Sequence, residues 1–272
     1  MQPRSHRAAL GAALLCAAAA ACTTPADAPA APPIQAATVV AGGPADYDAL
    51  LQKYVKGEFV DYAGWKADAA DLARFDAFLE WQGDADVAAM PRNDQIAFYV
   101  NAYNACCIKG ILDHYPVHAP VDVDGYFDKL KFRVGGEDLT INNIEYDRLI
   151  PRYRDMRAHF ALVCSDRGCP PLRNAAYTGA TLDQDLEAAA RRFVADKRNL
   201  VVDPAKKEVQ VSKLLEWYGK DFTSDPNRPA AKPELFLMSW ADESTRALLA
   251  SGDYQVKVIE WSWTLNEKRQ AR

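Results

Sequence analysis

Apolar residues recur at steps of three and four along several stretches of the chain, and this period predicts amphipathic helices. The longest such stretch covers residues 94–115, where Asn93 or Asp94 can cap the helix and Pro116 ends it. Its apolar face is formed by Ile96, Val100, Tyr103, Cys107 and Ile111. Shorter stretches with the same period predict helices over residues 46–55, 68–81, 142–150, 181–195 and 213–221.

Other stretches carry the patterns of strands. Residues 131–140 alternate around Gly135-Gly136 and residues 199–212 around Asp203-Pro204, so each stretch predicts a hairpin. Two continuous apolar runs, residues 157–164 and 254–261, are of the kind found in buried strands. The aromatic stretch 59–65 is expected to be irregular, and residues 223–233 are expected to form a loop.

Together these elements predict an α+β fold in which a helical layer packs on a mostly antiparallel sheet. No internal repeat and no second linker rich in Pro, Gly or Ser divides the chain after residue 45. We therefore expect a single domain over residues 45–272, which is long enough and apolar enough to bury a core.

The start of the chain differs from this domain. Residues 1–21 combine two arginines with an apolar run too short to span a bilayer, which is typical of a signal peptide. The small residues directly before Cys22 resemble the lipobox of bacterial lipoproteins, in which cleavage leaves the cysteine as a lipid-modified N-terminus. A signal peptide cut at an ordinary small-x-small site is the alternative. Because Thr23 rather than Asp follows the cysteine, the resemblance favours the periplasmic side of the outer membrane.

Residues 22–44 are rich in Ala, Pro and Thr, and we expect them to be a disordered tether. Loss of residues 1–21 removes Arg4 and Arg7, so the 32 basic residues fall to 30 against 37 acidic ones, a net charge of 30 − 37 = −7. With no long basic run, this charge argues against nucleic-acid binding. No later segment is long and apolar enough to span a bilayer, so the lipid would be the only membrane attachment.

Four cysteines remain once the leader and Cys22 are set aside. Cys106 and Cys107 lie in the long predicted helix and are expected to pack as small apolar residues. Cys164 and Cys169 are close enough in sequence to form a disulfide in an oxidising periplasm.

The segment from His159 to Pro171 joins a histidine to both of these cysteines, and it is our strongest candidate for a site. On a regular strand, His159 and Cys164 would lie about 17 Å apart on opposite faces and could not pair. The turn-forming stretch 165–168 permits a contact between His159 and Cys169 instead. A histidine that only completes the core is the alternative.

Three interpretations of Cys164 and Cys169 remain open. A disulfide would fix the turn, whereas a thiolate activated by His159 would attack an acyl carbon. As zinc ligands, the histidine and the two cysteines supply only three donors at a spacing that matches no common finger, so we expect no metal and no cofactor. Nearby, Arg167 and Arg173 either bind a carboxylate or phosphate or are solvated charges.

Three other polar residues have both a functional and a structural interpretation. Asn101 and Asn104 lie on or beside the apolar face of the long helix, where buried amides either contribute to a site or tie down backbone. Glu145 is either a catalytic carboxylate or the partner of Asn142 in a capping box.

Five stretches in this order resemble the family known as domain of unknown function 547. They are AFYVNAYNACCIKGILDHYP from Ala97, LTINNIEYDRLI from Leu139, HFALVCSDRGCPPLR from His159, SKLLEWYGKDF from Ser212 and WSWTLN from Trp261. Bacterial members of the family are secreted or lipid-anchored, and plant members carry the domain after a coiled-coil segment. The family's pattern carries over to Asn101, Tyr103, Asn104, Glu145, His159, Cys164, Pro170 and Trp217 of this chain.

The resemblance has two further implications. The family has Cys or Ser at the position of Cys169, which makes Cys164 the more characteristic thiol. The resemblance also implies a remote likeness to papain-like or transglutaminase-like folds, whose nucleophile lies at the start of a helix. In this chain the helix carries Asn101 and Asn104 there, and its cysteines come further along.

Two functional hypotheses follow. In the first, this is an envelope lipoprotein with thiol-dependent acyl-transfer or amide-hydrolysing activity, whose site residues are Asn101, Asn104, Glu145, His159 and Cys164. In the second, it is a non-catalytic envelope lipoprotein that binds a small molecule, a peptide or a partner, and its two close cysteines form a structural disulfide. The redox state of those cysteines distinguishes the hypotheses.

Overall fold

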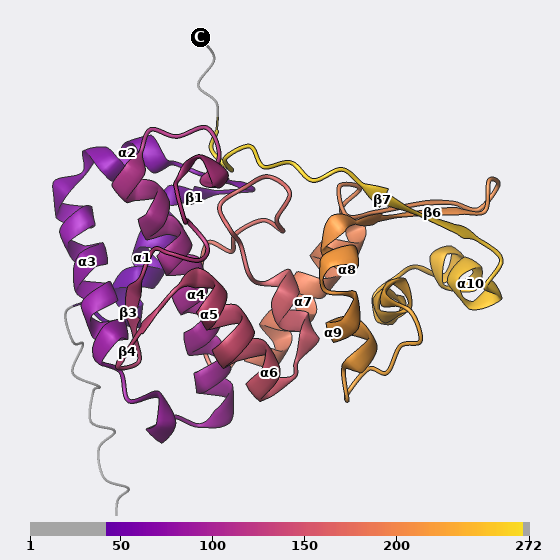
Figure 1. Ribbon diagram of the computed structural model, residues 1–272, viewed down its shortest axis with the longest axis horizontal. Helices are drawn as coiled ribbons and strands as arrows, with labels where there is room; N and C mark the ends of the chain where they lie inside the picture. The colour runs from indigo at the N-terminus through magenta and orange to yellow at the C-terminus, as the bar shows by residue number, and fades with distance from the viewer. Residues whose placement is uncertain (1–41, 269–272) are drawn as a thin grey trace, which may run out of the picture. The chain divides into compact units, whose positions relative to one another are not determined.

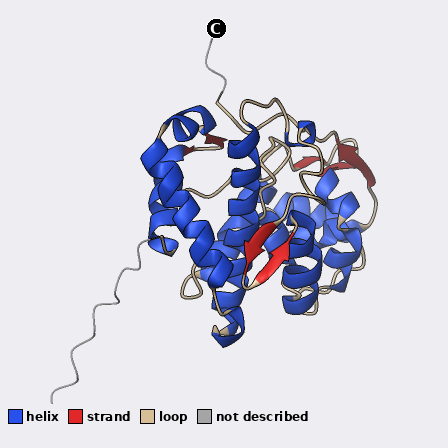
Figure 2. Ribbon diagram, turned by 60° about the vertical axis from the view of Figure 1, so that its left-hand side comes forward, coloured by secondary structure: helices blue, strands red, loops and turns tan. Residues whose placement is uncertain are grey.

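The computed structural model describes residues 42–268. The expected signal peptide over residues 1–21, the expected lipid site at Cys22 and most of the tether over residues 22–44 lie outside the described residues. Within them helices predominate and the strands are short (Figures 1 and 2), which confirms the α+β class. No helix in this part of the chain is both long enough and apolar enough to cross a membrane.

The helical elements of residues 42–268 include all six helices predicted from the apolar period. The α-helices are α1 (Pro44–Tyr54), α2 (Tyr62–Ala67), α3 (Ala69–Asp84), α4 (Arg92–His114), α5 (Ile141–Asn143), α6 (Ile150–Tyr153), α7 (Leu182–Ala195), α8 (Lys213–Trp217), α9 (Gly219–Ser224) and α10 (Glu243–Ser251). Four 3-10 helices and one π-helix join them: η1 (Val87–Ala89), η2 (Pro120–Asp122), η3, the π-helix (Ile144–Leu149), η4 (Met156–Phe160) and η5 (Pro233–Ser239).

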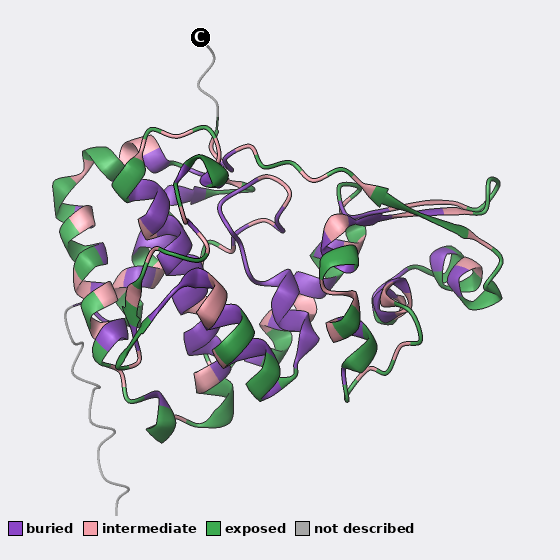
Figure 3. Cartoon of the chain, viewed as in Figure 1, coloured by how far each residue is buried: buried purple, intermediate pink, exposed green. Residues whose placement is uncertain are grey.

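Helix α4 lies at the centre of the helical part of the fold. Fifteen of its 23 residues are buried, and it contacts α2, α5, α7 and η3. Figure 3 shows it as a mostly buried helix. Cys106 and Cys107 are fully buried in it, as predicted for small apolar residues. The expected cap at Asn93 or Asp94 is wrong, because the helix begins after Pro91 without a side-chain cap, and Asp94 instead accepts a hydrogen bond from the Gly179 N–H.

The strands form three small sheets. They are the antiparallel pairs β1 (Val55–Lys56) with β2 (Phe59–Val60) and β3 (Phe132–Val134) with β4 (Glu137–Leu139), and a sheet in which β5 (Leu200–Asp203) runs antiparallel and β7 (Gln255–Ile259) parallel to β6 (Glu208–Ser212). Both predicted hairpins are confirmed, and Gly135 and Gly136 turn the first at φ values of 56° and 85°. Three of the four strand pairings are antiparallel, as predicted, but the strands are divided among three small sheets rather than joined in one.

Three local expectations also need correction. Residues 157–164 do not form a strand, because the N–H groups of Ala161 and Leu162 bond back to the Ala158 carbonyl and close a helical turn. Strand β7 forms as expected but is exposed rather than buried, since it lies at the edge of its sheet and pairs with β6 alone among the described strands. The stretch 59–65 is regular rather than irregular, because the Asp61 side chain caps α2 directly after β2.

Candidate functional site

His159 lies on η4, and its imidazole is held between two carboxylates. Its Nδ1 is 3.3 Å from Glu145 Oε1, and its Nε2 is 3.1 Å from Asp221 Oδ2. The ring of Tyr218 packs against it with centroids 4.1 Å apart. Only 1% of the His159 side chain is exposed, so these groups decide its charge.

Burial by itself would lower the pKa of the His159 imidazole, but hydrogen bonds and charge from Asp221 and Glu145 outweigh it and raise that pKa above the ordinary value. The imidazolium form is thus favoured. Because both ring nitrogens face carboxylates, neither is placed to take a proton from a thiol. The contact between His159 and Cys169 that the sequence permitted is not among the hydrogen bonds of this ring.

Glu145 faces His159 from the π-helix η3. The cap of this helical run is Thr140, whose Oγ1 accepts from the Asn143 N–H while the Asn143 side chain accepts from the Thr140 N–H. The expected capping box of Asn142 with Glu145 is therefore wrong. The Ile150 N–H bonds the Glu145 carbonyl five residues back, and such π-helical turns occur often at functional sites.

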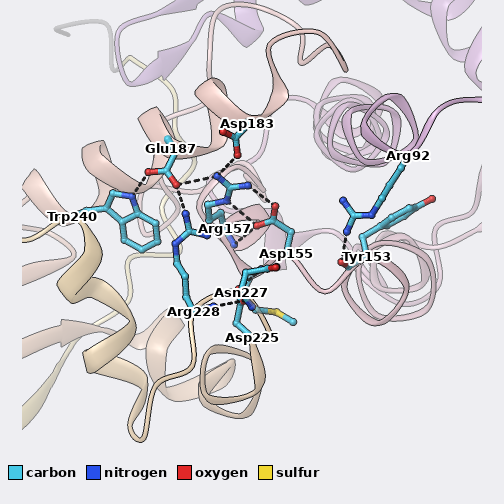
Figure 4. Close-up of polar contacts among 11 residues, drawn as sticks. Arg92, Tyr153, Asp155, Arg157, Asp183, Glu187, Asp225, Asn227, Arg228 and Trp240 are labelled. Carbon is cyan, nitrogen blue, oxygen red and sulfur yellow. Dashed lines mark hydrogen bonds and ion pairs between the residues drawn. The ribbon is translucent and has the colours of Figure 1, made fainter. Parts of the chain in front are cut away.

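A second polar network fixes η4 from its other side. Arg157 bonds Asp155 on its own turn and reaches Asp183 and Glu187 of α7, with nitrogen–oxygen distances of 2.7, 2.7 and 3.0 Å (Figure 4). Glu187 also accepts from the Trp240 indole N–H at 2.6 Å. These contacts attach the turn that carries the histidine to the helix behind it.

The amides of α4 bind backbone rather than His159. Asn104 donates to the Ala161 carbonyl at 3.0 Å and accepts from the Val163 N–H at 2.8 Å, so it holds the segment between η4 and the cysteines. Asn101 makes the same pair of bonds with the Tyr177 backbone, at 2.8 and 2.9 Å. Both amides therefore tie down backbone, as the structural interpretation predicted, and neither is hydrogen-bonded to the histidine.

The two close cysteines surround a buried carboxylate. Cys164 Sγ lies 2.7 Å from Cys169 Sγ and donates to Asp166 Oδ2 at 3.2 Å. Asp166 Oδ1 accepts from the N–H groups of Gly168 and Cys169, and Oδ2 also accepts from the Trp261 indole at 3.1 Å. The carboxylate therefore closes the turn between the thiols.

No disulfide joins Cys164 and Cys169 in the structure, since their sulfurs lie 2.7 Å apart and a disulfide bond is about 2.05 Å long. The hydrogen bond to Cys169, together with burial, holds the pKa of the Cys164 thiol well above its usual value, and burial raises the pKa of Cys169. One donor atom from each of Cys164, Asp166 and Cys169 lies within 4.8 Å of the others, a set that soft divalent metals bind. Two zinc–sulfur bonds would hold the sulfurs about 3.7 Å apart, which is wider than the 2.7 Å between Cys164 Sγ and Cys169 Sγ.

Arg167 and Arg173 do not lie with these residues as an anion site. Arg167 donates to the Glu267 carbonyl, and its guanidinium covers the Phe59 ring. Arg173 pairs with Asp185 at 2.9 Å. Each guanidinium therefore already has a partner within the protein.

A cavity of about 410 Å³ adjoins both the histidine cluster and the thiols. His159, Glu145, Cys164 and Cys169 line it, and no lysine or arginine among residues 42–268 does. Half of its 14 lining residues are aromatic: Tyr103, Phe127, Tyr146, Trp217, Tyr218, Trp261 and Trp263. The volume is that of a small-molecule site.

Four residues of this arrangement were not singled out in the sequence. Asp166 lay inside the quoted segment but was treated only as part of a turn, and nothing in the pattern indicates Asp221 or Tyr218 as neighbours of His159. The spacing of Trp261 and Trp263 was a usable signal, because side chains two residues apart in an extended segment point to the same side. Both indoles line the cavity.

The fold and cavity define an α+β protein with an aromatic cavity beside a buried histidine. Residues 87–194 match the family described as Protein of unknown function, DUF547. This match confirms the resemblance for the part of the chain that holds α4, Glu145, His159 and the two cavity cysteines. No curated protein and no solved structure matches the chain.

Proposed function

We propose that the protein binds a small molecule or a peptide end in the aromatic cavity. The observation that carries this proposal is the position of the exposed aromatic rings. Six large apolar side chains are exposed in the described part of the chain, and Tyr146, Trp217 and Trp263 are three of them. All three line the cavity with Glu145 and His159, which is where exposed apolar surface and fixed polar groups together support binding.

The cavity offers a ligand both packing and orientation. The rings of Trp217, Trp261 and Trp263 lie within 6.0 Å of one another and form one wall. The Tyr146 and Tyr218 hydroxyls, 3.1 Å apart, supply polar contacts that orient a ligand, whereas the rings supply apolar burial. Because Glu145 is held by His159, it meets a ligand without having to be ordered first.

A fragment library screened by ligand-observed NMR tests this proposal. Trp217→Ala and Trp263→Ala should each weaken the fragments that bind, because each removes an exposed ring from the cavity. Val258→Ala is the matched control, since Val258 is 41% exposed and lies outside the cavity. A screen in which no fragment responds to the cavity variants would overturn the proposal.

Thiol-dependent acyl transfer or amide hydrolysis is a second candidate, favoured by the 3.2 Å contact with Asp166 Oδ2 that Cys164 Sγ makes, since Cys164 lines the cavity. The thiol proton would pass to the ionised Asp166, and the sulfur would add to the acyl carbon. The carbon–nitrogen bond then breaks, and the amine leaves with the proton returned by Asp166. Water or an acceptor amine would release the thioester and restore the thiol.

A thiol-reactive acyl probe tests the second candidate. Labelling should disappear in Cys164→Ser, persist in Cys106→Ser and fall in Asp166→Asn, all in folded protein. The sequence-based mechanism expects His159→Gln to abolish labelling as well, whereas the geometry expects a smaller effect because the imidazole contacts no sulfur. Equal labelling of wild type and Cys164→Ser would exclude this activity.

The sequence further supports an envelope lipoprotein attached through Cys22, at the periplasmic side of the outer membrane. The motif of small residues before Cys22 and the tether over residues 22–44 are its basis. Metabolic labelling with an alkyne fatty acid should mark the wild type and leave Cys22→Ala unmarked. Membrane fractionation of the labelled protein then tests the outer-membrane assignment.

A further inference from the structure

We infer that the aromatic cavity selects organic cations, such as an alkylammonium or quaternary ammonium group, over neutral and anionic ligands of the same shape. This inference rests on the proposed binding function and adds the charge of the ligand. It depends on two independent features of the cavity, its charge and its open ring faces.

The first feature is a negative charge that the single histidine paired with it does not fully balance. Glu145 lines the cavity, and within residues 42–268 its one ionic partner is His159. The same imidazole also pairs with Asp221, so two carboxylates share one histidine. The cluster carries a net negative charge whether that histidine is protonated or neutral. Since no lysine or arginine lines the cavity, an anionic ligand would meet repulsion and a cation attraction.

The second feature is a set of aromatic rings whose faces are not covered by lysine or arginine side chains of the described residues. Seven contacts of lysine or arginine over rings occur in the described part of the chain, and none involves a ring of the cavity. Indole faces attract cations more strongly than other side-chain rings, and the cavity has three indoles. Aromatic cages are the arrangement by which proteins recognise quaternary ammonium groups.

A neutral ligand would use the same rings but would gain nothing from Glu145. The free energy gained by burying apolar surface is roughly proportional to the buried area, so two ligands of equal shape gain equally from it. The difference in affinity between a cation and its neutral isostere therefore isolates the charge term.

The experiment compares three probes of one shape: choline, its neutral isostere 3,3-dimethylbutan-1-ol, and the anion 3,3-dimethylbutanoate. Titrations followed by tryptophan fluorescence, at matched ionic strength, should show choline binding at least about tenfold more tightly than the alcohol, with the anion weakest. Choline that binds no better than the alcohol, including no binding at all, would overturn the inference. If the alcohol binds and responds to Trp217→Ala, the proposed binding function stands while the inference on charge fails.

Two variants separate the charge from the rings. Glu145→Gln should remove most of the preference for choline and leave the alcohol unchanged, in protein whose fold is checked by circular dichroism. Trp217→Leu keeps an apolar side chain at an exposed position but removes its π face, so it should weaken choline about fivefold and the alcohol little. A parallel loss of both probes in both variants would show that packing alone holds the ligand, against the inference.

Discussion

Arg157 and His159 lie two residues apart on η4, and both are buried ionisable side chains, yet their surroundings differ. The guanidinium of Arg157 is enclosed by carboxylates that fix α7 and the neighbouring turn (Figure 4). Arg157 lines a cavity of about 380 Å³, and all of the other residues that line it except Leu182 are charged or polar. The imidazole of His159 is also paired with carboxylates, but it borders a cavity of about 410 Å³ with aromatic walls. The aromatic walls, rather than a buried charge or adjoining space alone, thus distinguish the proposed ligand site.

The largest expected effect on stability is at Arg157. Arg157→Met should lower the free energy of unfolding by about 3–5 kcal/mol, because it leaves Asp155 as a buried charge without its partner. Urea denaturation measures the loss. Arg148→Met is the control, since the pair of Arg148 with Glu137 is exposed and should contribute at most about 1 kcal/mol. Equal losses in the two variants would contradict the structural role of Arg157.

Asn104→Ala should cost about 2–3 kcal/mol of unfolding free energy, because the Ala161 carbonyl and the Val163 N–H would lose their buried partner. Urea denaturation measures this variant too. A variant that keeps its stability but loses ligand binding or labelling would instead support the functional interpretation of the amide.

The pH dependence of stability separates His159 from Arg157, since only the imidazole titrates near neutral pH. Because the pKa of His159 is raised in the folded state, its stabilising contribution is complete below the unfolded value of about 6.5 and is lost as pH rises through the folded value. Unfolding free energies measured at several pH values should therefore fall across that range in wild type. The fall should vanish in His159→Gln, and its persistence there would assign the titration to another group.

The thiols on the cavity wall should be slow to react. The raised pKa values of Cys164 and Cys169 keep them protonated near neutral pH, so alkylation by iodoacetamide should be at least about tenfold slower in folded than in unfolded protein. Mass spectrometry of modified peptides gives the rates. A folded-state rate above the unfolded rate would indicate an activated thiol and strengthen the enzymatic candidate.

The smallest expected effect on stability is at an exposed ring of the aromatic cavity. Trp217→Ala should change the unfolding free energy by no more than about 0.5 kcal/mol, because 44% of this side chain is exposed. Its effect on ligand binding should nevertheless be large. A strongly destabilised variant would show that the ring serves the fold rather than the ligand.

The sequence predicted the regular elements better than the site. The apolar period placed α4 and the hairpin at Gly135-Gly136 correctly, because each depends on residues close in sequence. It failed for residues 157–164, where an apolar run suits a strand or a buried turn equally, and the bonds from Asn104 hold the turn's far end. The local pattern cannot show whether such a run becomes a strand or a turn, because the deciding contacts come from residues far away in the sequence.

The same limit applies to the site residues. His159, Glu145 and Cys164 were identified, and the structure places all three around one cavity. Asp221 was not found, because its 62-residue separation from His159 is bridged only by the fold of the later helices. The mechanism expected for the thiols depended on which way the imidazole points, and sequence spacing does not determine this.

The cavity is divided between two parts of the chain. Residues 87–194, which match the family model, supply Glu145, His159, the cysteines and the rings of Tyr103, Phe127 and Tyr146. Tyr218 and the three indoles, Trp217, Trp261 and Trp263, come from beyond this range. A protein that keeps the first part and replaces the indoles would retain the pair of Glu145 with His159 while recognising a different molecule.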